Sequence, residues 1–151
     1  MGYKYITTGE QYNYLPSIGP TITAFDNIVF NDMKVLDVGS GLGEFMVYLK
    51  LYCKDELKVN INVSGIEIDK NITNYVKIPT QFIDAFAFNG YGNYDLIYLY
   101  QPIRNVDLMV KLLEYISQYK VQIIYNNSSV TESQLTNLNF TKLKNNIWHY
   151  K

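Results

Sequence analysis

The glycine-rich stretch VLDVGSGLGEF, residues 35–45, constrains the fold more than any other part of this sequence. An apolar run reaches an acid, Asp37, and three glycines follow at every second position, Gly39, Gly41 and Gly43. Because glycine has no side chain, these residues allow a tight turn in which a ligand can approach the backbone closely. In open α/β sheets ligands bind beyond the carboxyl ends of the strands, so this stretch predicts the edge of a binding pocket.

The spacing of apolar residues predicts further strands and helices on both sides of this motif. The predicted strands cover residues 34–38, part of 59–68, 80–83, 94–100 and 121–125. The predicted helices cover residues 21–30, 42–52, 71–76 and 106–119, the last with a buried stripe of Leu108, Leu112, Tyr115 and Ile116. Residues 1–20 are rich in turn-forming and aromatic residues, which indicates an irregular arm or one short helix.

The C-terminal segment completes the predicted sheet. Ser129-x-x-Glu132 and Thr131-x-x-Gln134 both fit a capping box that opens a short helix. Two strand-like segments then flank residues 144–146, as expected for a hairpin. Because strands separated by helices pair in parallel, we expect an α/β fold: a doubly wound, mostly parallel seven-stranded sheet with a C-terminal antiparallel hairpin and helices on both faces.

Composition limits the classes of function. A chain of 151 residues, 48% of them hydrophobic, suits a single domain over residues 1–151. A formal net charge of −1 argues against nucleic acid as a partner. One cysteine and one histidine can form neither an internal disulfide nor a histidine metal site. Without a leader-like segment or an apolar run of about 18 residues, we expect a cytoplasmic protein with no metal and no membrane partner.

The spacing of the glycines separates the candidate ligands. A dinucleotide fingerprint, G-x-G-x-x-G, would need a third glycine where this chain has Glu44. A phosphate-binding loop would need a Gly-Lys-Ser or Gly-Lys-Thr ending, which this sequence lacks. A carboxylate at the start of a helix would also repel a pyrophosphate. Asp37 instead favours a ligand with a cationic end, such as the amino group and sulfonium of S-adenosylmethionine.

With this motif the sequence resembles the class I S-adenosylmethionine-dependent methyltransferases, in a minimal form without a substrate domain. The resemblance runs from residue 34 through the last hairpin, and VLDVGSGLGEF is similar to the family's first motif. It implies that the cofactor is S-adenosyl-L-methionine. It also implies that the methionine and ribose end of this cofactor is lined by Asp37, Gly39, Ser40, Gly41 and Gly43.

The next two strand ends add further cofactor-binding candidates. Glu67 ends the second predicted strand, where a carboxylate can accept hydrogen bonds from both ribose hydroxyls. Asp84 follows the third strand, and the resemblance places it beside the adenine amino group. Ile68, Ala85 and Phe86 are then candidates for apolar contact with the adenine ring.

The end of the fourth strand, YQPI, supplies the candidate catalytic residues Tyr100, Gln101 and Pro102, with Ile103 beside them. It lacks the Asn/Asp-Pro-Pro-Tyr/Phe motif of amino-directed DNA and glutamine methyltransferases. The segment NYLPS, residues 13–17, is similar to the arm of small lysine-directed methyltransferases. We therefore expect a protein amine or a small molecule as methyl acceptor, with the N-terminal arm, a second protomer or a partner subunit completing its site.

Other functions stay open at the level of sequence. One is a cofactor-binding regulatory or assembly module without transfer activity, since no general base is evident in these motifs. Another is a different reaction of the same cofactor, such as its cleavage. A nicotinamide oxidoreductase is disfavoured by Glu44.

Overall fold

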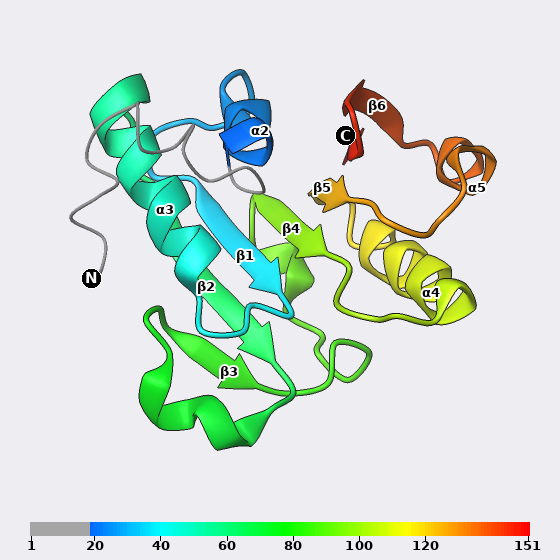
Figure 1. Cartoon of the computed structure of the whole chain (residues 1–151), viewed down its shortest axis with the longest axis horizontal. Coiled ribbons are helices and arrows are strands. Elements are labelled where there is room, and N and C mark those ends of the chain that lie inside the picture. Colours follow the sequence, from blue (N-terminus) through cyan, green and yellow to red (C-terminus); the bar gives the residue numbers. More distant parts are fainter. Residues whose placement is uncertain (1–18) are drawn as a thin grey trace.

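The protein forms one seven-stranded sheet with the order β3-β2-β1-β4-β5-β7-β6 (Figure 1). The computed structural model describes residues 19–151. Five strands run parallel: β1 (Lys34–Val38), β2 (Asn62–Glu67), β3 (Thr80–Phe82), β4 (Leu96–Tyr100) and β5 (Gln122–Asn126). The hairpin of β6 (Thr141–Lys144) and β7 (Ile147–Tyr150) is antiparallel and pairs with β5. The predicted fold class is confirmed.

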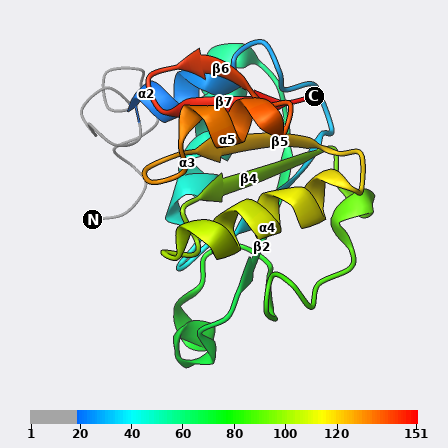
Figure 2. The same ribbon diagram turned by 90° about the vertical axis from the view of Figure 1, so that its right-hand side faces the viewer.

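Helices cover both faces of the sheet, with α4 in front of the strands and α3 behind them in Figure 2. One face carries α3 (Glu44–Tyr52), which continues into a π-helical turn over Cys53–Leu57. The other face carries α4 (Val106–Ser117) and α5 (Glu132–Asn137). The remaining helical pieces are short: α2 (Gly19–Ile22) and 3₁₀ turns at Thr23–Phe25, Lys70–Tyr75 and Tyr91–Asn93.

The central strands are apolar on both sides because each side meets a helix. In β1, Val35 packs in the cluster that holds Met46 and Leu49 of α3. The alternate residues Leu36 and Val38 pack in the cluster formed with α4. The switch in strand order falls between β1 and β4, and the arrowheads of β1 to β4 point the same way in Figure 1. Their carboxyl ends therefore share one edge, where the site residues gather.

Two sequence-based expectations about helices were wrong. The helix predicted over residues 21–30 ends at Phe25, where Asp26, Asn27 and β-branched neighbours favour turns over helix. The buried stripe of α4 consists of Met109, Leu112, Leu113 and Ile116. Leu108 is instead 45% exposed, because the helix is rotated by one residue from the predicted face.

The second of the two predicted capping boxes opens α5. The side chain of Thr131 accepts a hydrogen bond from the Gln134 backbone N–H at 3.1 Å, and Oε1 of Gln134 accepts one from the Thr131 backbone N–H at 3.0 Å. Within the described chain, no helix is both long and apolar enough to span a membrane. Most of the predicted N-terminal arm, including residues 13–17, lies outside the described residues.

Candidate functional site

The three glycines after β1 all adopt left-handed backbone conformations, with φ of 75°, 56° and 87° for Gly39, Gly41 and Gly43. A Cβ atom on Gly39 would lie 2.6 Å from Cβ of Pro102, and one on Gly43 would lie 2.6 Å from Cγ1 of Ile78. A Cβ on Gly41 would meet nothing within 4 Å. Gly39 and Gly43 are thus required by packing as well as by conformation, whereas Gly41 presents its backbone to open space.

Glu67 ties this glycine loop to the end of β2. Its Oε1 accepts a hydrogen bond from the Gly41 N–H at 2.9 Å, and its Oε2 accepts one from the Asp69 N–H at 2.8 Å. An ionised carboxylate offers about four acceptor positions, so two stay open for a ligand. Glu67 is half-buried, and it can hold the loop and accept hydroxyl hydrogen bonds at the same time.

Asp37 lies within the protein on the α3 side of the sheet, with 4% of its surface exposed. Among residues 19–151, no hydrogen bond to its carboxyl group is found. Burial raises the pKa of Asp37 well above its usual value, and the nearby charge of Glu67 raises it further. Buried polar groups are nearly always paired, so a carboxylate in this position suits a cationic ligand group.

Replacing Asp37 with asparagine should raise the free energy of unfolding at pH 7 when no ligand is bound. Burial raises the pKa of Asp37 in the folded state above the unfolded value of about 3.9. Between these pKa values the folded state holds more protons than the unfolded state, so wild-type stability falls as pH rises. Asparagine lacks this titration.

Urea denaturation at several pH values measures this difference. It should shrink as the pH falls toward about 3, where the carboxyl group is mostly protonated in both states. An advantage of Asp37→Asn that stays constant with pH would contradict the assignment of the titrating group.

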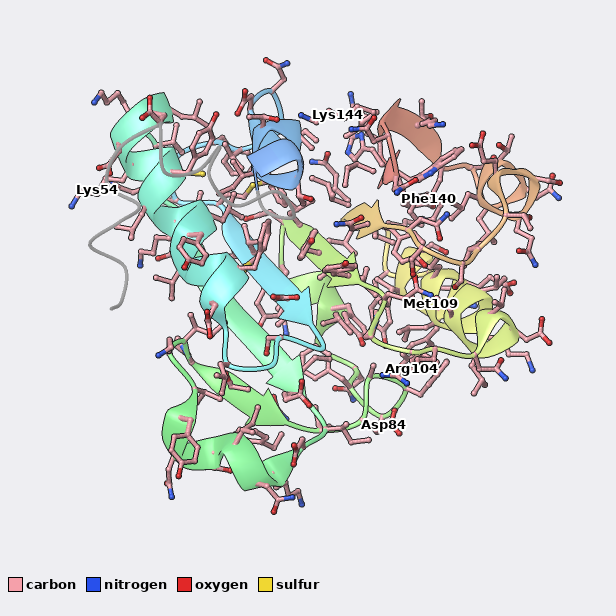
Figure 3. The ribbon with its side chains drawn as sticks, in the orientation of Figure 1. Lys54, Asp84, Arg104, Met109, Phe140 and Lys144 are labelled. Carbon is pink, nitrogen blue, oxygen red and sulfur yellow. The ribbon has the colours of Figure 1, made fainter. Side chains whose placement is uncertain are left out.

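A pocket of about 540 Å³ opens at the shared carboxyl edge of β1 to β4. In Figure 3 the labelled Asp84 and Arg104 lie at the edge toward which these strands point. The pocket lining includes eight of the predicted site residues: Gly39, Glu67, Ile68, Asp84, Ala85, Tyr100, Gln101 and Pro102. Asp37, Ser40, Gly41 and Gly43 are not part of this lining. The roles of all twelve residues stay predictions.

One wall of the pocket is the loop after β3. Oδ1 of Asp84 accepts a hydrogen bond from the Phe86 N–H at 2.8 Å, which shapes the turn. The Ala85 carbonyl accepts one from the hydroxyl of the buried Tyr91 at 2.7 Å. The side chains of Ile68 and Phe86 are 68% and 38% exposed on this wall. Apolar side chains left open here suit a flat, weakly polar ring such as adenine.

The opposite wall consists of the end of β4 and the start of α4. Tyr100 is 56% exposed, and Leu108 of α4 faces the pocket beside it. Sequence reasoning missed Leu108 because it predicted the other face of that helix. Gln101 was predicted as a candidate catalytic residue, but its amide is engaged within the protein: it forms hydrogen bonds with the Tyr125 and Ser129 hydroxyls. Those partners come from the next strand and its loop, and no local sequence signal marks them.

Sequence comparisons leave the family of this chain unassigned. No protein-family model matches it, and no curated protein matches it.

Several solved structures nevertheless superpose on nearly the whole of this chain. Magnesium protoporphyrin IX methyltransferase from Synechocystis PCC 6803, solved with bound S-adenosylmethionine, superposes with a TM-score of 0.63 at 9% identity, over 99% of this chain and 83% of that one. The PH0226 protein from Pyrococcus horikoshii OT3 superposes with a TM-score of 0.61 at 14% identity, over 97% of this chain and 92% of that one. Precorrin-6y C5,15-methyltransferase from Geobacter metallireducens GS-15 superposes with a TM-score of 0.54 at 12% identity, over 99% of this chain and 89% of that one. The chain therefore has the Rossmann-like fold of class I methyltransferases.

Proposed function

We propose that this protein transfers a methyl group from S-adenosylmethionine to a protein amine or a small molecule. The observation that carries the proposal is the buried Asp37 carboxyl, which has no hydrogen-bond partner in residues 19–151 and lies two residues before the first glycine of the loop. A dinucleotide or a triphosphate would bring negative charge to this position, whereas S-adenosylmethionine brings an amino group and a sulfonium. The fold shared with a methyltransferase solved with bound S-adenosylmethionine supports the same conclusion.

The residues at this edge can serve the whole cofactor. Asp37 would hold the amino group, and the open acceptor positions of Glu67 would hold the ribose hydroxyls. Asp84 would accept from the adenine amino group, with the ring held between apolar side chains of the lining, Ile68, Ala85, Phe86 and Ile103. When bound, S-adenosylmethionine supplies a methyl group on a positively charged sulfur, which makes the methyl carbon electrophilic.

The chain's own part in the transfer is to orient the acceptor and exclude water. Tyr100 and Leu108 supply an exposed apolar wall at the end of β4, the side expected to face the methyl group. The ionisable side chains in the pocket lining are Glu67, Asp84 and Tyr100. An acceptor that arrives as a neutral amine needs no further base from the protein. The cytoplasmic location stays a prediction from the sequence.

Titration calorimetry tests the proposal. The purified protein should bind S-adenosylmethionine and S-adenosylhomocysteine, and it should bind NAD and ATP at least about 100-fold more weakly, because their phosphates would face Asp37 and Glu67. Preference for NAD would overturn the interpretation of the glycine loop. If radiolabelled S-adenosylmethionine binds but labels nothing in any cell extract, a binding module without transfer activity becomes the better function.

A further inference from the structure

The turn after β4 contains a residue in an unusual conformation. Gln101 has a φ of 44°, in the left-handed region that side chains with a Cβ rarely adopt. Residues in that region persist only where the surroundings hold them, and they concentrate at functional sites. The contacts that hold Gln101 in this conformation therefore affect the pocket that Gln101 lines.

The side-chain amide of Gln101 is bonded at both ends. Its oxygen accepts a hydrogen bond from the hydroxyl of Tyr125 and a longer one, at 3.4 Å, from the Ser128 N–H. Its nitrogen donates to the hydroxyl of Ser129. These contacts, here called the Gln101 brace, join the loop after β4 to the end of β5 and its following loop.

The β5 end of the brace is firmly placed. Tyr125 is fully buried in the core formed with α4. The loop after β5 is closed by Asn127, whose Oδ1 accepts hydrogen bonds from the N–H groups of Ser129 and Val130 at 3.1 and 2.9 Å. The Asn127 N–H also donates to the carbonyl of Asn146 in the β6–β7 turn, at 2.8 Å. The brace thus connects Gln101 to a buried tyrosine of β5 and to a loop that is held by hydrogen bonds.

The other end of the connection reaches the glycine loop. Pro102 follows Gln101 directly and packs against Gly39, leaving no room for a Cβ atom there. The N–H groups of Gly39 and Ser40 both donate to the carbonyl of Ile66, at 2.9 and 3.1 Å. A change in the backbone at Gln101 moves Pro102, and with it one wall of the loop that would hold the cofactor.

We propose that Gln101 is a positioning residue: through its bonds to Tyr125 and Ser129 it fixes the left-handed turn that presses Pro102 against Gly39 and so sets the shape of the glycine loop. This inference rests on the proposed function for its ligand. It assigns Gln101 to the cofactor side of the pocket and to an indirect role, in place of direct contact between its amide and the acceptor.

Two variants test the brace without placing a new group in the pocket. Tyr125→Phe removes a hydroxyl from a residue outside the pocket lining, and Gln101→Gly removes the amide while allowing the left-handed conformation. Tyr52→Phe is the matched control, because it removes the hydroxyl that donates to Asp26 at 2.7 Å on the far side of the sheet.

Two readouts are needed, calorimetric affinity for S-adenosylhomocysteine and amide hydrogen exchange of Gly39 and Ser40 without ligand. We expect Tyr125→Phe, which removes one hydrogen bond of the brace, to weaken affinity about 5- to 20-fold, and Gln101→Gly, which removes all three, to weaken it at least as much. Exchange at the two amides should be faster by about the same factor, while Tyr52→Phe changes neither. The double variant should bind no more weakly than Gln101→Gly alone, because the tyrosine hydroxyl then has no amide partner to lose.

The outcomes separate this inference from the proposed function. If wild-type protein binds S-adenosylhomocysteine and both variants bind it equally well, the inference is wrong and the proposed function stands. Faster exchange with unchanged affinity also overturns the inference, since the shape of the loop would then not matter to the ligand. If wild-type protein does not bind, the proposed function fails, and exchange alone decides whether the brace holds the glycine loop.

Discussion

Gly41→Val abolishes binding of S-adenosylmethionine and its demethylated product while the sheet stays folded; this is the largest effect that we expect from a single substitution. A side chain at position 41 meets no protein atom within 4 Å, so its branched carbons occupy the space in front of the loop. The left-handed φ of 56° disfavours valine by about 1–2 kcal/mol, a fraction of the stability of a typical domain. Calorimetry should show affinity reduced by at least about 100-fold, with thermal unfolding still cooperative.

Two other glycines provide the controls for this substitution. Gly92→Val adds the same side chain where the nearest atom, Cδ1 of Tyr119, is 3.7 Å from the new Cβ, and both folding and binding should survive. Gly39→Val forces its Cβ to 2.6 Å from that of Pro102, so both folding and binding should suffer. If Gly41→Val binds the cofactor like wild type, the ligand does not approach the loop at Gly41, and the proposed placement is wrong.

The sequence was sufficient to predict the sheet, because its strands are short apolar runs separated by amphipathic helices. The edge residues Glu67, Asp84 and Tyr100 could be predicted for the same reason, since parallel strands bring their carboxyl ends together. The glycine motif added the chemistry, because Asp37 and its glycines are neighbours in the chain.

Features that depend on tertiary packing could not be predicted from the sequence. A rotation of α4 about its own axis by one residue decides whether Leu108 or Met109 is buried, and the apolar pattern of that helix is compatible with both orientations. The contact of Gln101 with Ser129 spans 28 residues, so only the pairing of β4 with β5 brings them together. The burial of Asp37 likewise depends on tertiary packing: the pairing of β1 with β4 places Tyr98 beside Asp37 in the sheet, and the ring of Phe45 in α3 stacks on the ring of Tyr98 with centroids 4.5 Å apart.

Glu67→Ala should weaken cofactor binding by about 1.5–3 kcal/mol, or roughly 10- to 150-fold, as expected for hydrogen bonds to a charged group. Two physical effects contribute. The variant loses the acceptor positions proposed for the ribose hydroxyls, and it also frees the Gly41 N–H that Glu67 holds at 2.9 Å. Calorimetry with S-adenosylhomocysteine and with its 2′-deoxy analogue separates these effects, because the analogue lacks one of the two hydroxyls.

The analogue should lose less affinity than the parent ligand when Glu67 is replaced, and the difference between the two losses is the energy of the contact with the 2′-hydroxyl. Asp69→Ala is the matched control: it removes a carboxylate two residues away that accepts from the Asn71 N–H and lies outside the pocket lining, so it should leave both affinities nearly unchanged. Equal losses for both ligands on Glu67→Ala would mean that Glu67 acts through the glycine loop alone. The ribose hydroxyls would then need another acceptor at this edge, and Asp84 is the other carboxylate in the pocket lining.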